Sequence, residues 1–451
     1  MKRLLAKIQE EQVRKALIYA VWEGGFWAIM FGFADSYLVP FARLFQASAF
    51  QLSLIQGVAL LGTCLAQIAG AQLTMRVRQR KLIALVAVRI QAFGWLLILG
   101  VALWTRNAWT IVAIYFIQLL GANLGAPGWL SWMNDLVPTT FRGEYWGLRN
   151  RTVGMVQVAS MTMAGLFLQL AKSFHFEHLA FGILFVLAFA ARFGSSVMLQ
   201  KQYEPPMQVD THADEEMRLA TLLPKLFTTN FGRFAVFRIL MAFAANVLAP
   251  VLSIFLLESL HYNYVQFTVL MMASTVTSFF SMTYWGPLSD RYGNYRVITV
   301  TALMVPVFAF GWGILKNFYL QLLLQLFAGF VWSGFDLAVM NYIFDTLPRT
   351  HVAKISAYLN MFTNLFAFAG TVLAGALTKL TPQIPAPFWA PGHYEIIFLL
   401  SGFLRVLVAV MLLKAFQEVR QVEPSPAFHH FYIYKPVRHV VNAIQVLNVR
   451  R

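Results

Sequence analysis

Cysteine is almost absent from this chain, and so are the short signatures of enzymatic and metal sites. Its 451 residues contain one cysteine, Cys64, which excludes an intramolecular disulfide. The sequence has no GxSxG, HExxH or CxxC pattern, and it lacks the GxxxxGK[ST] loop that cradles nucleotide phosphates. We therefore expect no enzyme activity, no catalytic residue, no cofactor and no metal, and the missing nucleotide loop excludes an ATP-driven pump.

Charged residues are also scarce. They make up 12% of the chain, whereas 59% of it is hydrophobic and the mean hydropathy is +0.62. A soluble fold of this size could not bury so much apolar surface, so we expect the lipid bilayer to be its partner. The net charge of +16 is spread over many short loops rather than gathered on one face among aromatics, which argues against a nucleic-acid partner.

Apolar stretches long enough to cross a hydrocarbon core of about 30 Å, which takes roughly 20 residues, recur along the whole chain. The first six lie at 17–40, 50–74, 82–104, 108–136, 146–171 and 178–200. The second six lie at 230–258, 264–285, 297–315, 318–346, 355–380 and 394–416. The alternation of a transmembrane barrel is absent. The sequence thus predicts an all-α integral membrane protein with twelve transmembrane helices.

Lysine and arginine fix the expected orientation, because short cytoplasmic loops collect them. The N-terminal segment 1–16, a central linker at 201–229 and a basic tail at 417–451 all fall on one side. The opposite side keeps few basic residues: Arg43, Arg106, Lys172, Lys316 and Lys379. The chain start lacks a secretory signal. We expect both termini in the cytoplasm and the protein in a plasma membrane, of the bacterial inner-membrane type.

The two sets of six helices, at 17–200 and 230–416, are related to each other. A shift of 210 positions carries Pro40 onto Pro250, Asp135 onto Asp345, Pro138 onto Pro348 and Asn150 onto Asn360. An internal duplication explains these matches, and parallel repeats of this kind are a known transporter architecture. Since a duplicated chain supplies both halves of a pathway, we expect a monomer.

Polarity is concentrated between the eighth and ninth spans, in GPLSDRYGNYRV at 286–297. This stretch resembles the loop signature of the major facilitator superfamily through five residues: Gly286, Asp290, Arg291, Gly293 and Arg296. NDLVPTTFRGEYWGLRN at 134–150 is similar to the stretch after the fourth helix in many members, with Asp135 and Arg142 carrying the likeness. The resemblance covers essentially the whole chain, and it implies that family's fold and secondary transport of a small molecule.

Three departures from the family pattern narrow this expectation. The repeat-related loop between spans two and three has Thr74 where the aspartate would stand. The fourth helix lacks the arginine of many proton-coupled members, and the fifth lacks the glycine-proline pattern of drug antiporters. The resemblance therefore favours uptake over antiport.

The 286–296 loop is a candidate cytoplasmic gate. A tight turn brings Asp290 and Arg291 close to helix ends, where Arg291 can pair with Asp345 in one conformation and release it in another. Asp135 with Arg142 or Arg149 would form the matching set in the first half. The alternative is that these charges only anchor loops at the headgroups.

Carboxylates inside the spans are the candidates for proton coupling: Glu23, Asp35 and Asp336. An ionisable group in hydrocarbon costs roughly 2.5 to 3.5 kcal/mol on insertion scales, so each should face the bundle interior or a cavity. A carboxylate that is wetted in one state and desolvated in another changes its proton affinity between them. The alternatives are that Glu23 pairs with a basic residue such as Arg89 and that Asp35 lies near the outer headgroups.

The family resemblance implies that helices one, four, seven and ten line a central cavity. Polar and aromatic residues there, with one on span eleven, are candidate substrate contacts: Trp27, Gln118, Asn123, Asn246, Trp332 and Asn364. Amides beside tryptophans suit a hydroxyl-rich solute such as a sugar. The alternative is that the amides hold helices together and the tryptophans sit at interfaces.

Proton-coupled uptake of a small polar solute by alternating access is the function that these features favour. One alternative is a proton-driven exporter of amphiphilic compounds. Another is a non-transporting membrane receptor or scaffold that signals through the tail at 417–451.

Overall fold

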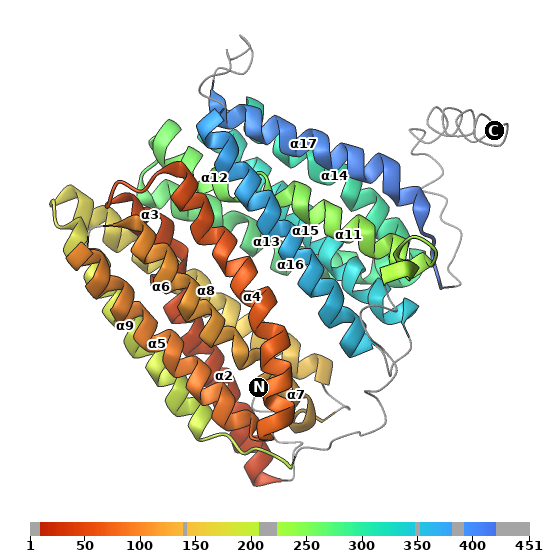
Figure 1. Ribbon diagram of the computed structural model, residues 1–451, viewed down its shortest axis with the longest axis horizontal. Helices are drawn as coiled ribbons and strands as arrows, with labels where there is room; N and C mark the ends of the chain where they lie inside the picture. Colours follow the sequence, from red (N-terminus) through yellow and green to blue (C-terminus); the bar gives the residue numbers. More distant parts are fainter. Residues whose placement is uncertain are drawn as a thin grey trace.

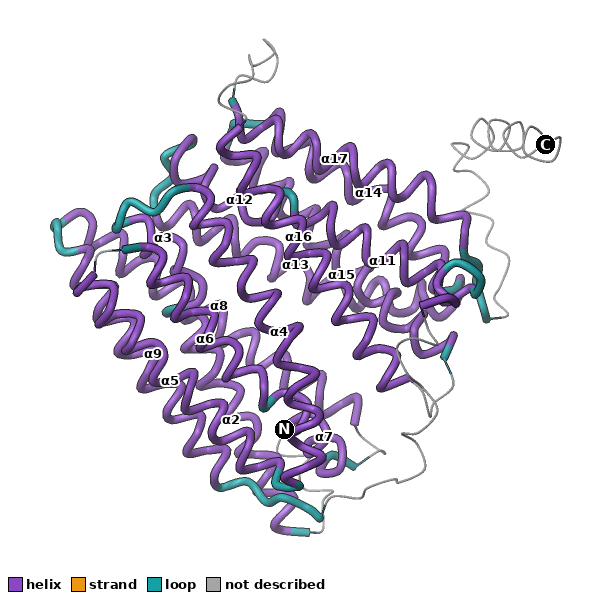
Figure 2. Tube along the Cα trace, viewed as in Figure 1, coloured by secondary structure: helices purple, strands orange, loops and turns teal. Residues whose placement is uncertain are grey.

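The computed structural model confirms an all-helical membrane protein. It describes residues 10–105, 107–138, 142–206, 223–347, 352–380 and 392–420. These residues form helices and turns without a strand among them (Figure 2). Twelve of the described helical segments are long and apolar enough to cross a membrane, as the hydropathy predicted.

The spans form two groups (Figure 1). The N-terminal half contains α2 (Glu11–Phe33), η1 (Asp35–Tyr37), α3 (Leu38–Arg43), α4 (Ala49–Val77), α5 (Arg80–Thr105), α6 (Ala108–Leu124), α7 (Ala126–Leu136), α8 (Arg142–Ser173) and α9 (Glu177–Gln200). The C-terminal half contains α11 (Asn230–Asn246), α12 (Ala249–Ile254), η4 (Phe255–Ser259), α13 (Tyr264–Tyr292), α14 (Asn294–Ile314), α15 (Phe318–Thr346), α16 (Val352–Leu380) and α17 (His393–Leu412).

Helix starts repeat between the halves, as an internal duplication predicts. Ser48 and Gln51 form a capping box at the start of α4, and Asn263 and Gln266 form one at the start of α13. The Asn107 side chain accepts a backbone N–H of α6, as Asn317 does for α15. Each cap satisfies amide hydrogens that have no partner inside the helix. Similar capping residues therefore fix the start of the corresponding helix in each half.

Spans one and seven are interrupted at equivalent places. α2 ends at Phe33 and the chain passes through η1 into α3, while α11 ends at Asn246 and α12 begins at Ala249. Pro40 and Pro250 lie just beyond these breaks. Proline lacks the N–H of the regular helix ladder and its ring crowds the carbonyl four residues earlier, which explains both interruptions.

The halves pack along two helix pairs, α4 with α16 and α8 with α13. We call the end where α9 stops and α11 starts the linker end, and the end carrying α3, α12 and the start of α17 the distal end. Near the distal end Gly57 faces Thr371 and Phe368, and Gly375 faces Phe50. Missing side chains at these glycines let the two halves approach closely.

Candidate functional site: charged clusters within and at the ends of the bundle

Polar contacts connect the two halves at the distal end. Arg43 of α3 donates from Nη1 to the Leu257 carbonyl at 2.7 Å, and its Nε lies 3.9 Å from Glu258 Oε1. Tyr394 donates its hydroxyl to the other oxygen of Glu258 at 2.9 Å. Arg43 was expected only as a topology charge, and here it bridges the halves.

Tyr264 provides a second bridge at the distal end. Its hydroxyl donates to Glu177 Oε1 at 2.7 Å, and its backbone N–H donates to Gln169 Oε1 at 3.2 Å. Deeper in the bundle the Tyr37 hydroxyl lies 2.8 Å from the Met161 carbonyl and 2.5 Å from Thr268 Oγ1. A cavity of ≈ 270 Å³ remains between Arg43, Tyr264 and their neighbours.

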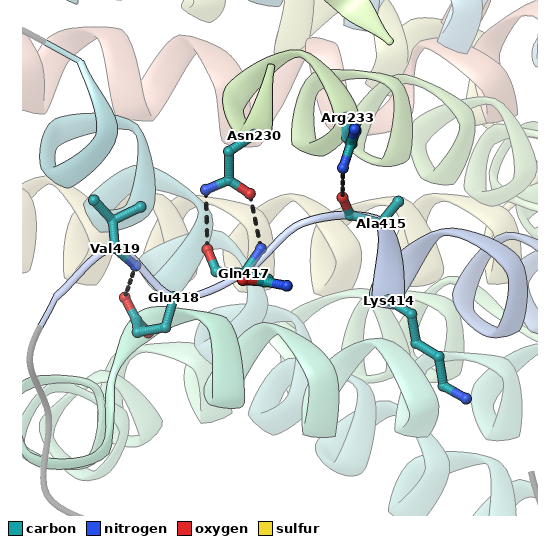
Figure 3. A pocket seen from close by; sticks show the side chains of 7 residues that line it. All are labelled: Asn230, Arg233, Lys414, Ala415, Gln417, Glu418 and Val419. Carbon is teal, nitrogen blue, oxygen red and sulfur yellow. Dashed lines mark hydrogen bonds between the residues drawn. The ribbon is translucent and has the colours of Figure 1, made fainter. Parts of the chain in front are cut away.

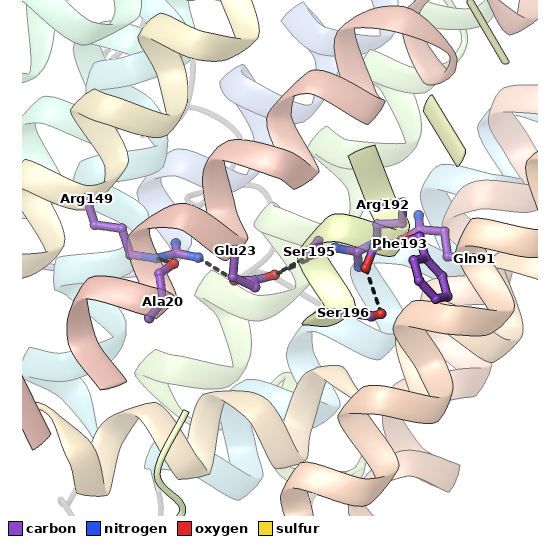
Figure 4. A network of polar contacts seen from close by, with 8 residues as sticks. All are labelled: Ala20, Glu23, Gln91, Arg149, Arg192, Phe193, Ser195 and Ser196. Atoms are coloured by element: carbon purple, nitrogen blue, oxygen red, sulfur yellow. Dashed lines mark hydrogen bonds and ion pairs between the residues drawn. The ribbon is translucent and has the colours of Figure 1, made fainter. Parts of the chain in front are cut away.

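Glu23 lies in a buried cluster of the N-terminal half (Figure 4). Its Oε2 is 3.2 Å from Arg149 Nη2, and its Oε1 is 3.6 Å from Arg192 Nη1. Ser195 Oγ lies 3.3 Å from Oε1, and Arg192 Nε donates to Gln91 Oε1 at 2.7 Å. The cluster thus ties α2 to α5, α8 and α9.

The partners of Glu23 differ from the expected one. Arg89 lies 3.5 Å from Gln200 Oε1, while Arg149 and Arg192 take the carboxylate. Arg149 also stacks on the rings of Trp129 and Trp146, at 5.0 and 5.4 Å from their centroids. Burial of a charge requires such paired and hydrogen-bonded surroundings, so the cluster has a clear structural role.

Asp35 is half-buried at the start of η1, just beyond the end of α2. Tyr115 of α6 donates its hydroxyl to Asp35 Oδ1 at 2.7 Å. The contact connects spans one and four where span one is interrupted.

Asp336 has a different environment from the other two carboxylates. It lies on α15 with 55% of its side chain exposed, and its Oδ1 is 3.5 Å from Arg238 Nη2 on α11. The Arg238 guanidinium lies over the Phe335 ring at 5.4 Å, and that ring is 5.5 Å from Trp332. The buried Arg405 of α17 lies 5.9 Å from the Trp332 centroid.

The six candidate substrate residues are dispersed. Gln118 is buried between α5 and α6 and donates to the Gln91 carbonyl at 3.1 Å, a placement that favours helix packing. Asn123 and Asn246 each donate to the carbonyl four residues earlier, Leu119 and Ala242. Half-buried positions on α2, α15 and α16 hold the other three: Trp27, Trp332 and Asn364. Trp332 contacts Arg405, and Gln118 reaches the Glu23 cluster through Gln91. Their role in substrate binding stays a prediction.

At the linker end of the N-terminal half, Arg80 is the centre of a network. Its buried guanidinium donates from Nη1 to Asp135 Oδ2 at 2.5 Å and lies 3.5 Å from Glu204 Oε1 through Nε. Its backbone N–H also donates to Glu204, at 2.9 Å. The pairing of Asp135 with Arg149 was therefore wrong, because Arg149 turns toward Glu23, and the Arg142 side chain lies outside the described part of the chain.

The C-terminal half has a related network. Asn294 donates from Nδ2 to Asp345 Oδ2 at 2.5 Å and contacts Ser289, while Glu418 Oε2 accepts the Tyr295 N–H at 2.8 Å. Arg420 Nη1 lies 3.8 Å from Asp345 and 3.9 Å from Asp290. Arg420 and Asn294 thus take the place of the expected Arg291 at Asp345.

The predicted gate loop is shorter than its sequence indicates. α13 continues to Tyr292, so Gly286, Asp290 and Arg291 are helical, and the turn is made by Gly293 at φ 93°. Arg291 lies over the Tyr292 ring at 5.2 Å, and Arg296 lies in the first turn of α14.

The chain after α17 is held by α11 (Figure 3). Asn230 donates to the Gln417 carbonyl at 3.1 Å and accepts the Gln417 N–H at 2.8 Å, beside a cavity of ≈ 380 Å³. This clamp places Glu418 and Arg420 at the helix ends. Sequence reasoning missed Glu204 and Glu418, although an acid follows the last span of each half and could have been found by aligning the repeats.

Several solved transporter structures share this architecture. The family model described as Major Facilitator Superfamily matches residues 234–443. The D-xylose-proton symporter structure has a TM-score of 0.70 at 14% identity, covering 91% of this chain and 99% of its own. The nucleoside transporter NupG has 0.67 at 11%, covering 90% and 99%. A bacterial homologue of the human lysosomal transporter Spinster, inward-facing and unoccupied, has 0.64 at 13%, covering 90% and 98%.

No curated protein matches the sequence. At these low identities the solved structures show the fold alone. The match to the family model lies in the C-terminal half. Residues 234–443 are thus similar to the major facilitator superfamily, and the whole chain, with twelve apolar helices, is an integral membrane protein that shares the fold of these transporter structures.

Proposed function

We propose that the protein is a monomeric secondary transporter that takes up a small polar solute together with protons by alternating access. The observation that carries this proposal is the Asp336–Arg238 pair, a half-exposed carboxylate beside a guanidinium within the apolar length of α15 and α11. Intramembrane ionisable groups are costly and characteristically mark substrate or proton pathways.

The face of α15 that carries Asp336 supports this role. Phe335 points toward α11, where its ring lies 6.1 Å from that of Phe237. Trp285 of α13 donates to the Phe330 carbonyl, on another side of the helix. Asp336 and Met340 are exposed on a strip flanked by these two contacts. Since α13 also packs on α8, we infer that the strip faces the N-terminal half.

Access to Asp336 is proposed from the linker end. The residue lies ten positions before the end of α15, which is about 15 Å at 1.5 Å per residue. We assign the linker end to the cytoplasm because the basic loops gather there. The Arg43 and Tyr264 bridges close the other end, as in a state that opens inward.

Glu23 and Asp35 are weaker candidates for the coupling site. Glu23 is buried and held by two guanidiniums, and Asp35 accepts a hydrogen bond from Tyr115 where span one is interrupted. Asp336 has one ion-pair partner and an exposed carboxylate, so water can deliver a proton to it in this state. Closure of the strip in the opposite state would change its solvation and thereby its proton affinity.

Transport by proteoliposomes tests the proposal. Wild-type protein should accumulate a polar solute from a panel of pentoses, hexoses, nucleosides and their acids when the pH gradient is imposed, and the signal should collapse with a protonophore. Asp336→Asn should lose accumulation and retain solute exchange across equal pH. Gradient-independent movement in both proteins would contradict proton coupling.

A further inference from the structure

We propose that the transported solute carries a carboxylate, which binds Arg238 when Asp336 takes up a proton. The inference rests on the proposed function and names the chemical class of the solute at the same site. A sugar acid, a polar hydroxylated molecule with one carboxylate, has the required chemistry.

The charge inventory of the C-terminal half is the first argument. Away from the ends of its six spans the ionisable residues of the Asp, Glu, Lys, Arg and His types are Arg238, Asp336 and Arg405; the others lie within four residues of a span end: Arg233, Glu258, Asp345, Lys379, Glu395 and Lys414. These three side chains leave one positive charge uncompensated when Asp336 is ionised. Protonation of Asp336 beside a neutral solute would leave two positive charges in the membrane interior, whereas an anionic solute replaces the charge that Asp336 loses.

Arg405 carries the uncompensated charge. It is 1% exposed, and its Nη1 and Nη2 donate at 3.3 Å to the carbonyls of Val305 and Ala245. Its Nε has no hydrogen-bond partner, and no carboxylate of the described chain lies within ion-pair distance. In the other half the comparable Arg192 has Glu23 as its partner. Arg405 therefore places a buried positive charge against the Trp332 ring.

The groups in front of that charge form a row suited to a small anion. Arg238 lies over Phe335, Phe335 contacts Trp332, and Trp332 contacts Arg405. Arg238 is 23% exposed, so its planar donors can be reached from the strip of α15 that carries Asp336. A guanidinium fork matches a carboxylate, and the aromatic faces supply apolar contact to the rest of the solute.

Coupling follows from competition for one guanidinium. With Asp336 ionised, its carboxylate occupies Arg238. A proton added to the Asp336 carboxyl neutralises it, and the carboxylate of the solute can then bind Arg238 in its place. One proton and one monoanion cross together without net charge, and release of the proton on the other side returns Asp336 to Arg238.

No other charged side chain competes for this position from the packed helices. α13 between 264 and 289, α14 between 297 and 314 and α16 between 355 and 378 contain no Asp, Glu, Lys, Arg or His. Arg238 of α11 is therefore the charged group in contact with Asp336 among these spans, and Arg405 of α17 lies behind Trp332.

Matched ligand pairs test the inference on the purified full-length protein. The pairs are D-glucuronate with D-glucose, D-xylonate with D-xylose, and nicotinate with nicotinamide. Ligands that bind the folded state raise the melting temperature. At least one acid should raise it more than its neutral partner does, and more at mildly acidic than at mildly alkaline pH.

Variants identify the groups responsible. Arg238→Gln should weaken acid binding about tenfold or more, since a charge-assisted hydrogen bond is lost, and Arg238→Lys should restore part of it. Asp336→Asn should bind the acid equally at both pH values, because its side chain is neutral throughout. Arg89→Gln, which changes an exposed arginine of α5 in the other half, should behave as the wild type.

The inference is overturned if both members of every pair shift the melting temperature equally, if only neutral members shift it, or if no acid shifts it. Acid binding that is unchanged by Arg238→Gln would overturn it as well. Accumulation of a neutral solute that still needs Asp336 would support the proposed function and contradict the inference of an anionic solute. Arg238-dependent binding of an acid without pH-driven accumulation would support the carboxylate site and contradict proton-coupled uptake.

Discussion

Glu204 and Glu418 hold equivalent helix starts in the two halves. Glu204 accepts the backbone N–H of Arg80, the first residue of α5, and Glu418 accepts that of Tyr295 in the first turn of α14. A carboxylate favours a helix N-terminus because the free amide hydrogens and the helix dipole point toward it. The duplication therefore includes the networks at the linker end, in addition to the helices.

The cation of these networks differs between the halves. Arg80 is built into the first turn of α5, whereas Asn294 stands at the related place and Arg420 reaches Asp345 from beyond α17. The C-terminal network takes both its acid Glu418 and its cation Arg420 from the chain after the last span, whereas the N-terminal network takes its acid Glu204 from there and its cation Arg80 from α5. It is therefore the more easily opened of the two, which fits a gate in the 286–296 region.

Removing Glu204 should destabilise the N-terminal half. Glu204→Ala leaves the buried Arg80 with one carboxylate fewer, and we expect a loss of about 1–3 kcal/mol in unfolding free energy, seen as a lower melting temperature. Glu11→Ala removes an exposed pair with Lys15 and should have little effect. Equal melting of the Glu204 variant and the wild type would contradict the network.

Glu23→Gln separates a structural role from a coupling role. Loss of a buried ion-pair partner leaves Arg149 and Arg192 facing each other, so we expect destabilisation of about 3–5 kcal/mol and poor yield of folded protein. Melting and size-exclusion profiles measure this. A stable variant that loses only pH-driven accumulation would move the coupling site to Glu23.

Arg43→Ala should weaken closure of the distal end. The Leu257 carbonyl and Glu258 lose their partner from the other half, which shifts the population toward a state open at that end. A cysteine introduced at Tyr262 should then react faster with a membrane-impermeant maleimide, the buried Cys64 being replaced by serine. Lys316→Ala, which removes a pair within the C-terminal half, serves as the control. Unchanged labelling in Arg43→Ala would show that other contacts close this end.

Two glycines of the predicted gate should respond oppositely to alanine. Gly293 has φ 93°, where a side chain is strained, so Gly293→Ala should cost roughly 1–3 kcal/mol and misplace α14. Gly286 lies inside α13 with open space at its Cβ position, so Gly286→Ala should be neutral or stabilising by up to about 1 kcal/mol. Melting of the two variants side by side decides this, and equal losses would contradict the assignment of the turn to Gly293.

The sequence predicts the span count and the duplication because hydropathy and repeated residues are local properties. Pro40 and Pro250 even mark where the first and seventh spans are interrupted. Ion-pair partners are less predictable, because they depend on how each helix is rotated about its axis. Arg89 and Arg149 both lie near Glu23 in depth, and only the packing of α8 decides that Arg149 reaches it.

The same limit applies to the site. Asp336 was a candidate because it interrupts an apolar span, but its pairing with Arg238 and its exposure come from the tertiary structure. The amide residues were chosen by span membership, and two of them bond the preceding helical turn. Rotation of a helix thus determines which polar residue faces the strip.

The pH-driven accumulation of solute by proteoliposomes carrying Asp336→Asn, measured beside wild type and Arg89→Gln, tests the central claim most directly. We predict normal melting and equilibrium exchange in Asp336→Asn, with accumulation lost, and wild-type behaviour in Arg89→Gln. Accumulation by Asp336→Asn at the wild-type level would show that Asp336 does not couple proton movement to transport.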